Sequence, residues 1–153
     1  MPAKTSAGLL LYRRGGGEIE VLLVHPGGPF TRNKDEGAWS IPKGEIEPGE
    51  EENLLARARI EFREELGADP PSGPYIELGA IKQKGGKTVH AWACEGDFTG
   101  PARSNTFDLE WPPASGKIQQ FPEIDRAEWF PLVEARVKIN PAQASFLDSL
   151  THP

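Results

Sequence analysis

The chain has little cysteine. Among its 153 residues only Cys94 is a cysteine, so the chain forms no internal disulfide and offers no cysteine pair to a zinc ion. The histidines, His25, His90 and His152, do not stand at a metal-ligand spacing either. The sequence therefore disfavours a zinc site and favours a reducing compartment.

Long apolar runs are absent as well. No stretch approaches the roughly 20 apolar residues that a membrane span needs. The N-terminal residues lack the charged-then-apolar pattern of a secretory signal. We therefore expect a cytoplasmic protein without a membrane partner.

Positive charge is scarce: 17 lysines and arginines stand against 23 acidic residues, which gives a net charge of −6. Sequence-independent binding to a nucleic-acid polymer needs a basic surface, so this class of partner is disfavoured. A small phosphorylated molecule is not excluded, because carboxylates can reach it through divalent cations.

The apolar residues, 37% of the chain, are gathered into short runs that fit a packed core. The length fits one domain, which we expect to cover residues 1–153. Alternating and aliphatic runs between turn residues predict strands, and longer runs of helix formers predict helices. The predicted strands are Lys4–Arg13, Glu18–His25, Ala38–Ile41, Tyr75–Lys82, Lys87–Cys94, Thr106–Trp111 and Ala127–Phe130, and the predicted helices are Glu51–Leu66, Leu132–Val137 and Pro141–Leu150. This order predicts an α/β fold with a mixed sheet covered by helices on both faces.

The predicted helix at Glu51–Leu66 carries a cluster of carboxylates. Glu61, Glu64 and Glu65 lie three and four positions apart, which places them in one sector of a helix. Roughly opposite, an apolar stripe is expected to pack on the sheet: Leu55, Ala58, Phe62 and Leu66. Like charges this close repel one another, and a divalent cation such as Mg²⁺ or Mn²⁺ relieves the conflict.

The segment around this helix resembles the signature of the Nudix hydrolases. Gly44, Glu61, Glu64, Glu65 and Gly67 match the glycines and glutamates of that signature. The resemblance implies an α/β/α sandwich with a catalytic loop-helix-loop that hydrolyses a diphosphate linkage in a nucleotide-like substrate with Mg²⁺, or with Mn²⁺.

The resemblance also implies roles for individual residues. Glu61, Glu64 and Glu65 would ligate the metal, and Glu64 is also a candidate catalytic group. The backbone carbonyl of Gly44 would add another ligand, and Lys43 would contact a substrate phosphate.

Two features depart from the signature. Ile60 occupies the position of the arginine that orients a catalytic carboxylate in the family, and isoleucine has no hydrogen-bond donor to replace it. Arg57, four residues before Glu61, faces the same sector and is a candidate substitute. The segment from Gly44 to Glu61 is two residues longer than usual, so the early glutamate of the signature is one of Glu50, Glu51 and Glu52.

A weaker resemblance lies outside the signature. The stretch from Lys87 to Trp92 and the spacing from Glu123 to Trp129 resemble diadenosine tetraphosphate hydrolases. This implies that Glu123 is the general base or an extra metal ligand, and it makes Lys87 a candidate for substrate phosphate binding.

The resemblance favours a dinucleoside polyphosphate substrate, with an ordinary nucleoside triphosphate as the alternative. ADP-ribose is less favoured, because the proline typical of its hydrolases is missing around Lys82 to Lys84. A Nudix-like module that binds a nucleotide with weak or no catalysis remains the alternative function, motivated by Ile60. The sequence leaves the oligomeric state open.

Overall fold

The structure, a computed structural model, describes residues 4–151. A six-stranded sheet forms its centre in the order β4-β5-β1-β2-β8, with β3 paired to β1 outside this path. The elements, in chain order, are β1 Thr5–Gly15, β2 Glu18–Pro26, β3 Lys43–Glu45, α1 Leu54–Leu66, β4 Tyr75–Lys82, β5 Thr88–Glu95, β6 Thr106–Glu110, β7 Ile118–Pro122, β8 Ile124–Pro131, α2 Leu132–Lys138, η1 Pro141–Gln143 and α3 Ala144–Thr151.

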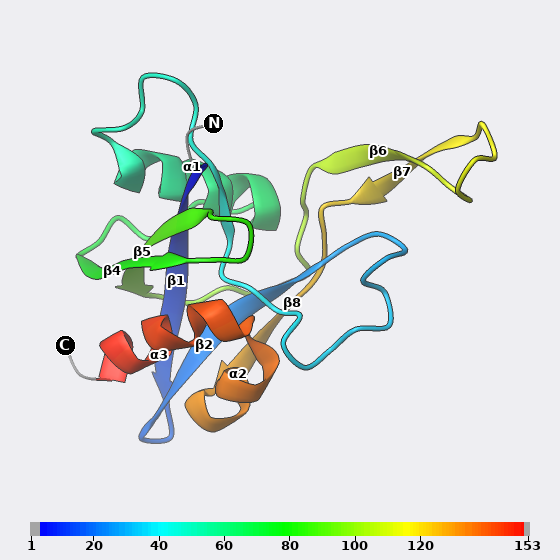
Figure 1. Ribbon diagram of the computed structural model, residues 1–153. Helices are drawn as coiled ribbons and strands as arrows, with labels where there is room; N and C mark the ends of the chain where they lie inside the picture. The colour runs from blue at the N-terminus through cyan, green and yellow to red at the C-terminus, as the bar shows by residue number, and fades with distance from the viewer. Residues whose placement is uncertain (1–3, 152–153) are drawn as a thin grey trace.

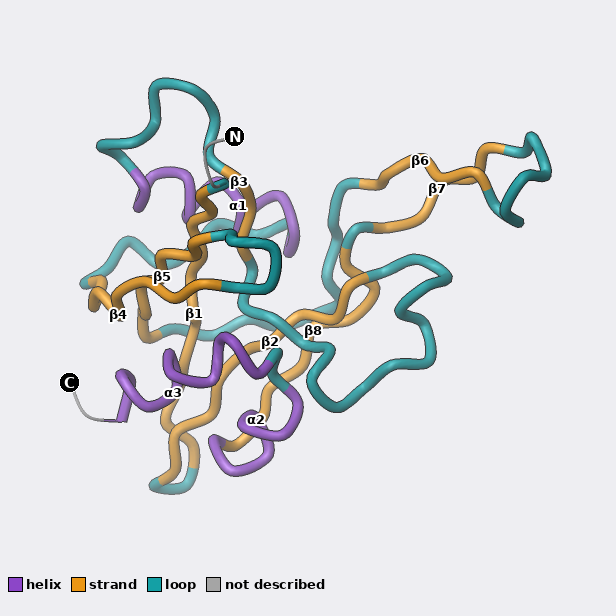
Figure 2. Tube along the Cα trace, in the orientation of Figure 1, coloured by secondary structure: helices purple, strands orange, loops and turns teal. Residues whose placement is uncertain are grey.

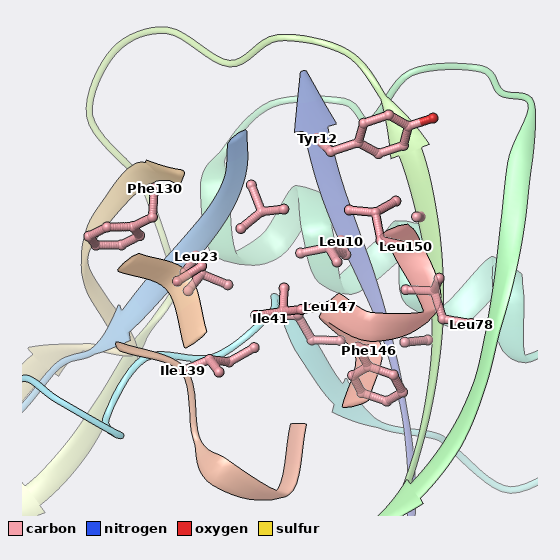
Figure 3. Packing of buried hydrophobic residues seen from close by; sticks show 14 of the residues in the cluster. Leu10, Tyr12, Leu23, Ile41, Leu78, Phe130, Ile139, Phe146, Leu147 and Leu150 are labelled. Atoms are coloured by element: carbon pink, nitrogen blue, oxygen red, sulfur yellow. The ribbon is translucent and has the colours of Figure 1, made fainter. Parts of the chain in front are cut away.

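Strand β1 is apolar on both faces, which makes the fold a three-layer sandwich. Leu10 and Tyr12 face a core shared with Leu147 of α3 (Figure 3). Leu9 and Leu11, which alternate with them, face a second core that includes Phe62 of α1. A strand buried on both faces reads as a continuous apolar run rather than an alternating one. The sheet therefore lies between α1 on one side and α2 and α3 on the other (Figure 1).

Strand β1 also organises the sheet laterally. It pairs parallel with β5 from Thr5 to Tyr12. On its other edge, residues Ser6–Gly8 pair antiparallel with β3, and residues Tyr12–Gly15 pair antiparallel with β2. This division of one edge between two partners holds β3 directly beside the sheet.

Strands β6 and β7 stand apart from the central sheet. They form a separate two-stranded antiparallel sheet, and Figure 2 shows this hairpin projecting away from the sandwich. We call residues Thr106–Pro122 the arm. Its apolar face packs on the loop after β2, where the ring of Phe30 meets that of Trp111 edge to face at 5.2 Å between centroids.

The predicted mixed sheet with helices on both faces is confirmed, and most predicted elements lie where expected. In residues 4–151 no helix is both long and apolar enough to cross a bilayer.

The strand predicted at Ala38–Ile41 is wrong. This segment makes only isolated bridges, from Ser40 to Val24 and from Trp39 to Ile139, and the strand of this region is β3. Trp39 and Ile41 are nevertheless buried, at 1% and 0% exposure. Their alternation reflects burial in the core and not strand pairing.

Strand β7 lies in a region for which the sequence predicts no strand. Its residues Ile118, Gln119 and Gln120 are exposed and pair only with β6. These exposed residues leave no hydrophobic alternation in this half of the hairpin, which removes the main signal for a strand. The helix predicted at Pro141–Leu150 is divided into η1 and α3.

A buried glutamine ties three segments together behind the sheet. Gln143, at 0% exposure, accepts a hydrogen bond from the backbone N–H of Ile41 at 3.1 Å. Its amide nitrogen donates to Ser40 Oγ at 3.0 Å and to Gln83 Oε1 at 2.9 Å. Buried polar groups are costly unless they are hydrogen-bonded, so this network depends on all of its members.

We expect Gln143→Ala to lower the free energy of unfolding by about 2 kcal/mol, because it leaves the buried Ile41 N–H without an acceptor. Urea denaturation measures the change. The control is Gln120→Ala, which removes an exposed side chain of the arm and should change stability by less than about 0.5 kcal/mol. Equal effects of the two substitutions would contradict a structural role for Gln143.

Candidate catalytic site

Helix α1 is anchored to the sheet by one apolar face. Ala58, Phe62 and Leu66 are buried, as expected from the predicted stripe. Leu54 packs against the same core in place of Leu55, which was the expected first member of the stripe. Gly67 ends the helix with a left-handed backbone, φ 74°, as its position predicts.

The helix begins at Leu54, three residues later than predicted. Glu51 and Glu52 lie in an exposed turn, which the backbone hydrogen bond from Asn53 N to Glu50 O closes at 2.9 Å. The helix was predicted to begin at Glu51 because these residues have a high helix propensity. The turn instead gives them a non-helical backbone. The first turn of α1 therefore contains no acidic residue.

Arg57 joins two carboxylates from different segments. It donates from Nε and Nη2 to the two oxygens of Glu50, both at 2.9 Å, and from Nη1 to Glu61 Oε2 at 3.1 Å. The Arg57 side chain is only 11% exposed, and bidentate pairs of this kind fix orientation as well as charge. Of the three candidate early glutamates, Glu50 is thus the one that contacts Arg57.

Four carboxylates lie within electrostatic range of one another. Each of Glu61, Glu65 and Glu123 has its pKa raised, first by burial and then by neighbouring negative charge. Glu64 acts on both Glu61 and Glu123, and Glu61 in turn raises the pKa of Glu65. The four side chains therefore form one cluster, although Glu123 is distant from α1 in the sequence.

Glu65 is the most deeply placed member of this cluster. At 8% exposure its pKa is raised to about 8, mainly because burial disfavours the charged carboxylate. Lys43 partly offsets this effect through its positive charge and its backbone. Burial and the nearby Lys87 lower the pKa of Lys43 itself.

Gly44 lies directly against Glu61. A Cβ at position 44 would stand 1.9 Å from Glu61 Oε1, so any side chain there would displace the Glu61 carboxylate from its present position. This contact brings the backbone of Gly44 beside the acidic cluster.

The donor set around this cluster suits a hard divalent cation. Carboxylates and a backbone carbonyl are the ligands that Mg²⁺ and Mn²⁺ prefer, and mutual repulsion raises the cost of leaving the cluster uncompensated. As the side chains stand, no three acidic, histidine or cysteine side chains in residues 4–151 converge on one ion position. Water and substrate oxygens commonly complete the shell of Mg²⁺, so the residues fit the ion in chemistry without forming a closed cage.

A cavity of about 290 Å³ opens beside the cluster, and Glu65, Lys43 and Glu123 are among the residues that line it. Its polar lining beyond these three residues was not identified from the sequence and comprises Ser40, Gln83, Asn140 and Gln143. In the sequence these four residues lie at or near the ends of predicted elements, some beside a hairpin and some beside Pro141. Such positions are common in exposed loops, so they did not mark these residues as part of a binding cavity.

Lys87 lies outside the lining of this cavity. Its Nζ is 3.5 Å from Glu45 Oε1, and its charge reaches Lys43. The structure thus brings together Lys43, Gly44, Arg57, Glu61, Glu64, Glu65 and Glu123, with Lys87 at the border of the group.

Comparison with known proteins identifies a matching family and several similar solved structures. The NUDIX domain family model matches residues 2–150. The NUDIX domain of NrtR from Shewanella oneidensis, solved in complex with ADP ribose, has a TM-score of 0.67 at 14% identity, over 99% of this chain and 88% of that one. The Ap4A hydrolase of C. elegans, solved as a binary complex, has a TM-score of 0.66 at 22% identity, over 96% of both chains. A NUDIX hydrolase from Nitrosomonas europaea has a TM-score of 0.65 at 18% identity, over 99% and 90%. At these identities the structures establish the shared fold.

We expect the metal-free protein to lose stability as the pH rises from about 5 to about 8. The pKa of Glu65 is raised from 4.5 to about 8 in the folded state, so over this range the folded protein holds a proton that the unfolded chain has released. The expected loss is on the order of 1–4 kcal/mol, measured by thermal unfolding with a chelator present.

Glu65→Gln removes the titrating group and should flatten this slope, while Glu51→Gln, at an exposed position, should retain it. A slope that is the same in wild type and in Glu65→Gln would show that Glu65 is not its source.

Proposed function

The chain belongs to the Nudix family of pyrophosphohydrolases, and we propose that it hydrolyses a diphosphate linkage in a nucleoside or dinucleoside polyphosphate in the cytoplasm. The observation that carries the proposal is the electrostatic cluster of Glu61, Glu64, Glu65 and Glu123 near Lys43, in which each carboxylate lies within electrostatic range of others. A packed protein gains nothing in stability from such a cluster, whereas a cation-dependent reaction at a phosphate requires it.

Divalent cations are the cofactors we propose, with Mg²⁺ first and Mn²⁺ as the alternative. Glu61, Glu64 and Glu65 would hold them, with the carbonyl of Gly44 as a further donor. When bound, such ions neutralise phosphate oxygens and lower the pKa of a bound water. The raised pKa of Glu65 supports this role, because a buried carboxylate without a cation holds a proton instead.

Arg57 takes over the orienting role that Ile60 cannot perform. Its guanidinium holds Glu61 from one side and Glu50 from the other, and these bonds fix the Glu61 carboxylate against Gly44. We accordingly propose Glu50 as the early glutamate of the signature. Compared with the signature, the segment before α1 is then two residues longer and the arginine lies three residues earlier. These two changes compensate for each other.

Glu123 serves as the general base or as an additional ligand. Burial and the charge of Glu64 raise its pKa, which strengthens the carboxylate as a proton acceptor for an attacking water. Lys43 binds a substrate phosphate and stabilises the charge that develops on it. Hydrolysis leaves one phosphate-bearing end on each product.

The cavity beside the cluster indicates where the nucleotide part of the substrate binds. Gln83 and Asn140 line it with amide groups, which donate to and accept from the polar edge of a nucleobase. Lys87 lies at the border of the site, where it would contact a more distant phosphate. We propose a dinucleoside polyphosphate as the first substrate to test, with a nucleoside triphosphate as the alternative.

A Nudix-like binding module without catalysis is the second candidate. Two observations suggest it. Position 60 holds isoleucine in place of the arginine of the signature, and the structurally similar NrtR domain was solved in complex with ADP ribose. The contacts of Arg57 weaken the case for this module, because the Glu61 carboxylate already accepts a hydrogen bond from Arg57 Nη1 at 3.1 Å.

A panel of nucleotides tests the proposal. With Mg²⁺ we expect turnover of diadenosine tetraphosphate or of a nucleoside triphosphate, detected by chromatography of the phosphate-bearing products, and loss of turnover with a chelator. Glu64→Gln should lower kcat by roughly 10²-fold or more, whereas Glu51→Gln, at an exposed position outside α1, should leave it unchanged. Tight binding of a nucleotide without turnover would favour the binding module.

The role of Arg57 is tested against a second arginine on the same helix. Arg57→Ala should lower kcat by roughly 10²-fold, because it releases Glu61 from its orientation. Arg63→Ala should change kcat by less than about twofold, since Arg63 bonds the exposed Asp69 and is itself 57% exposed. Steady-state kinetics at saturating Mg²⁺ measures both, and thermal unfolding confirms that each variant is folded. Equal, small effects would contradict the role of Arg57.

A further inference from the structure

Glu123 is connected to the catalytic helix through a chain of backbone hydrogen bonds. The N–H of Asn105 donates to the carbonyl of Glu64 at 3.2 Å, and the N–H of Glu123 donates to the carbonyl of Asn105 at 2.8 Å. The N–H of Gly27 then donates to the carbonyl of Glu123 at 2.9 Å. Both peptide groups of Glu123 are therefore held, one from the side of α1 and one from the loop after β2.

Gly27 makes its bond at an unusually close approach. A Cβ at position 27 would stand 2.0 Å from the carbonyl oxygen of Pro122, a backbone atom that has no rotamer with which to move away. The backbone of Gly27 does not adopt positive φ, so the requirement for glycine here is one of space alone. Any side chain at this position pushes the loop away from the residue that precedes Glu123.

The loop on the other side of this contact is itself fixed. Thr31 Oγ1 lies 2.9 Å from the carbonyl of Pro26 and 3.2 Å from that of Gly27, and it donates to them. Next to Gly27, a Cβ at Gly28 would stand 2.9 Å from the ring of Phe107 on the arm. The loop therefore fits closely against the base of the arm, where the chain turns into Glu123.

We propose that Gly27 is a positioning residue, which holds Glu123 at a fixed place relative to Glu64 through the backbone chain that Asn105 completes. This inference rests on the proposed role of Glu123. It adds that the loop after β2, which carries no catalytic group, determines whether the Glu123 carboxylate stands where a water or cation can use it. A displacement on the order of 1 Å at a catalytic group costs roughly 10²-fold in rate.

A double-mutant cycle separates positioning from general destabilisation. Gly27→Ala should lower kcat by roughly 10²-fold in the wild-type background and should have no further effect on kcat in Glu123→Gln, because the two changes remove the same contribution. The KM for the nucleotide should change less than kcat in both backgrounds, since the amide groups of Gln83 and Asn140 in the cavity lining are untouched.

Two other glycines provide matched controls. In Gly96→Ala the new Cβ would meet the ring of Pro71 at 2.5 Å, far from Glu123 in the fold, so a loss of stability without loss of kcat is expected. In Gly15→Ala the nearest atom outside the immediate chain neighbours is 3.5 Å away, so neither stability nor kcat should change.

A second variant avoids the steric clash and keeps the test decisive if Gly27→Ala folds poorly. Thr31→Val removes the hydroxyl that holds the loop at Pro26 and Gly27, and it should lower kcat by about fivefold, the equivalent of one hydrogen bond. This effect too should vanish in the Glu123→Gln background.

The amide signals of Asn105 and Glu123 in the NMR spectrum give a readout that does not depend on turnover. They should shift in Gly27→Ala and in Thr31→Val and remain in place in Gly96→Ala. Unchanged signals, or equal losses of kcat in both backgrounds of the cycle, would overturn the inference. If Glu123→Gln alone leaves kcat unchanged, the proposed role of Glu123 fails, and the amide signals alone decide whether Gly27 positions it.

Discussion

Repulsion among carboxylates is the constraint on which the catalytic part of this molecule depends. The pKa values of Glu61, Glu65 and Glu123 are raised by burial and by neighbouring carboxylates, Glu64 among them, and left to themselves these side chains would move apart or take up protons. The chain keeps them together partly by supplying opposite charge. Arg57 neutralises the outer side of Glu61, and Lys43 faces the buried Glu65.

The remaining restraint is mechanical. Helix α1 cannot turn its acidic face away, because Phe62 and Leu66 are buried in the core beneath it. Strand β3 cannot retreat, since it is paired with β1 and lies against the helix at Gly44. Packing free energy from the sheet thus holds an arrangement of charge that is unfavourable by itself, which is a common property of sites that bind cations.

Sequence reasoning succeeded where a local pattern has one physical meaning. The spacing of Glu61, Glu64 and Glu65 and the apolar stripe on α1 follow from helix geometry, and the two-sided burial of β1 follows from its continuous apolar run. The position of Arg57 four residues before Glu61 predicted their contact, which the structure contains. The bidentate bond from Arg57 to Glu50 was not predicted. It depends on the turn before α1, and the shape of a turn does not follow from the periodicity of the sequence.

The failures have physical causes as well. Trp39 and Ile41 alternate like a strand because both enter the core from a segment that makes only isolated bridges. Strand β7 gave no signal because the arm lies outside the core, where exposed residues such as Gln119 and Gln120 satisfy a hairpin. The cavity wall was missed because Gln83 and Asn140 meet only through the tertiary fold.

The parallel pairing of β1 with β5 has a consequence for the order in which the protein folds. Thr5 pairs with Thr88, and the whole signature helix lies in the chain between them. Closing so long a loop is slow compared with forming a helix or a hairpin, because the entropy of the intervening chain is lost before the contacts are gained. Phe62 of α1 packs against Leu9 and Leu11 of β1, and β1 also holds β3 beside the helix. We therefore expect the acidic face of α1 to become a complete site only in a chain whose central sheet is assembled, so that binding of a cation and folding of the sheet are coupled.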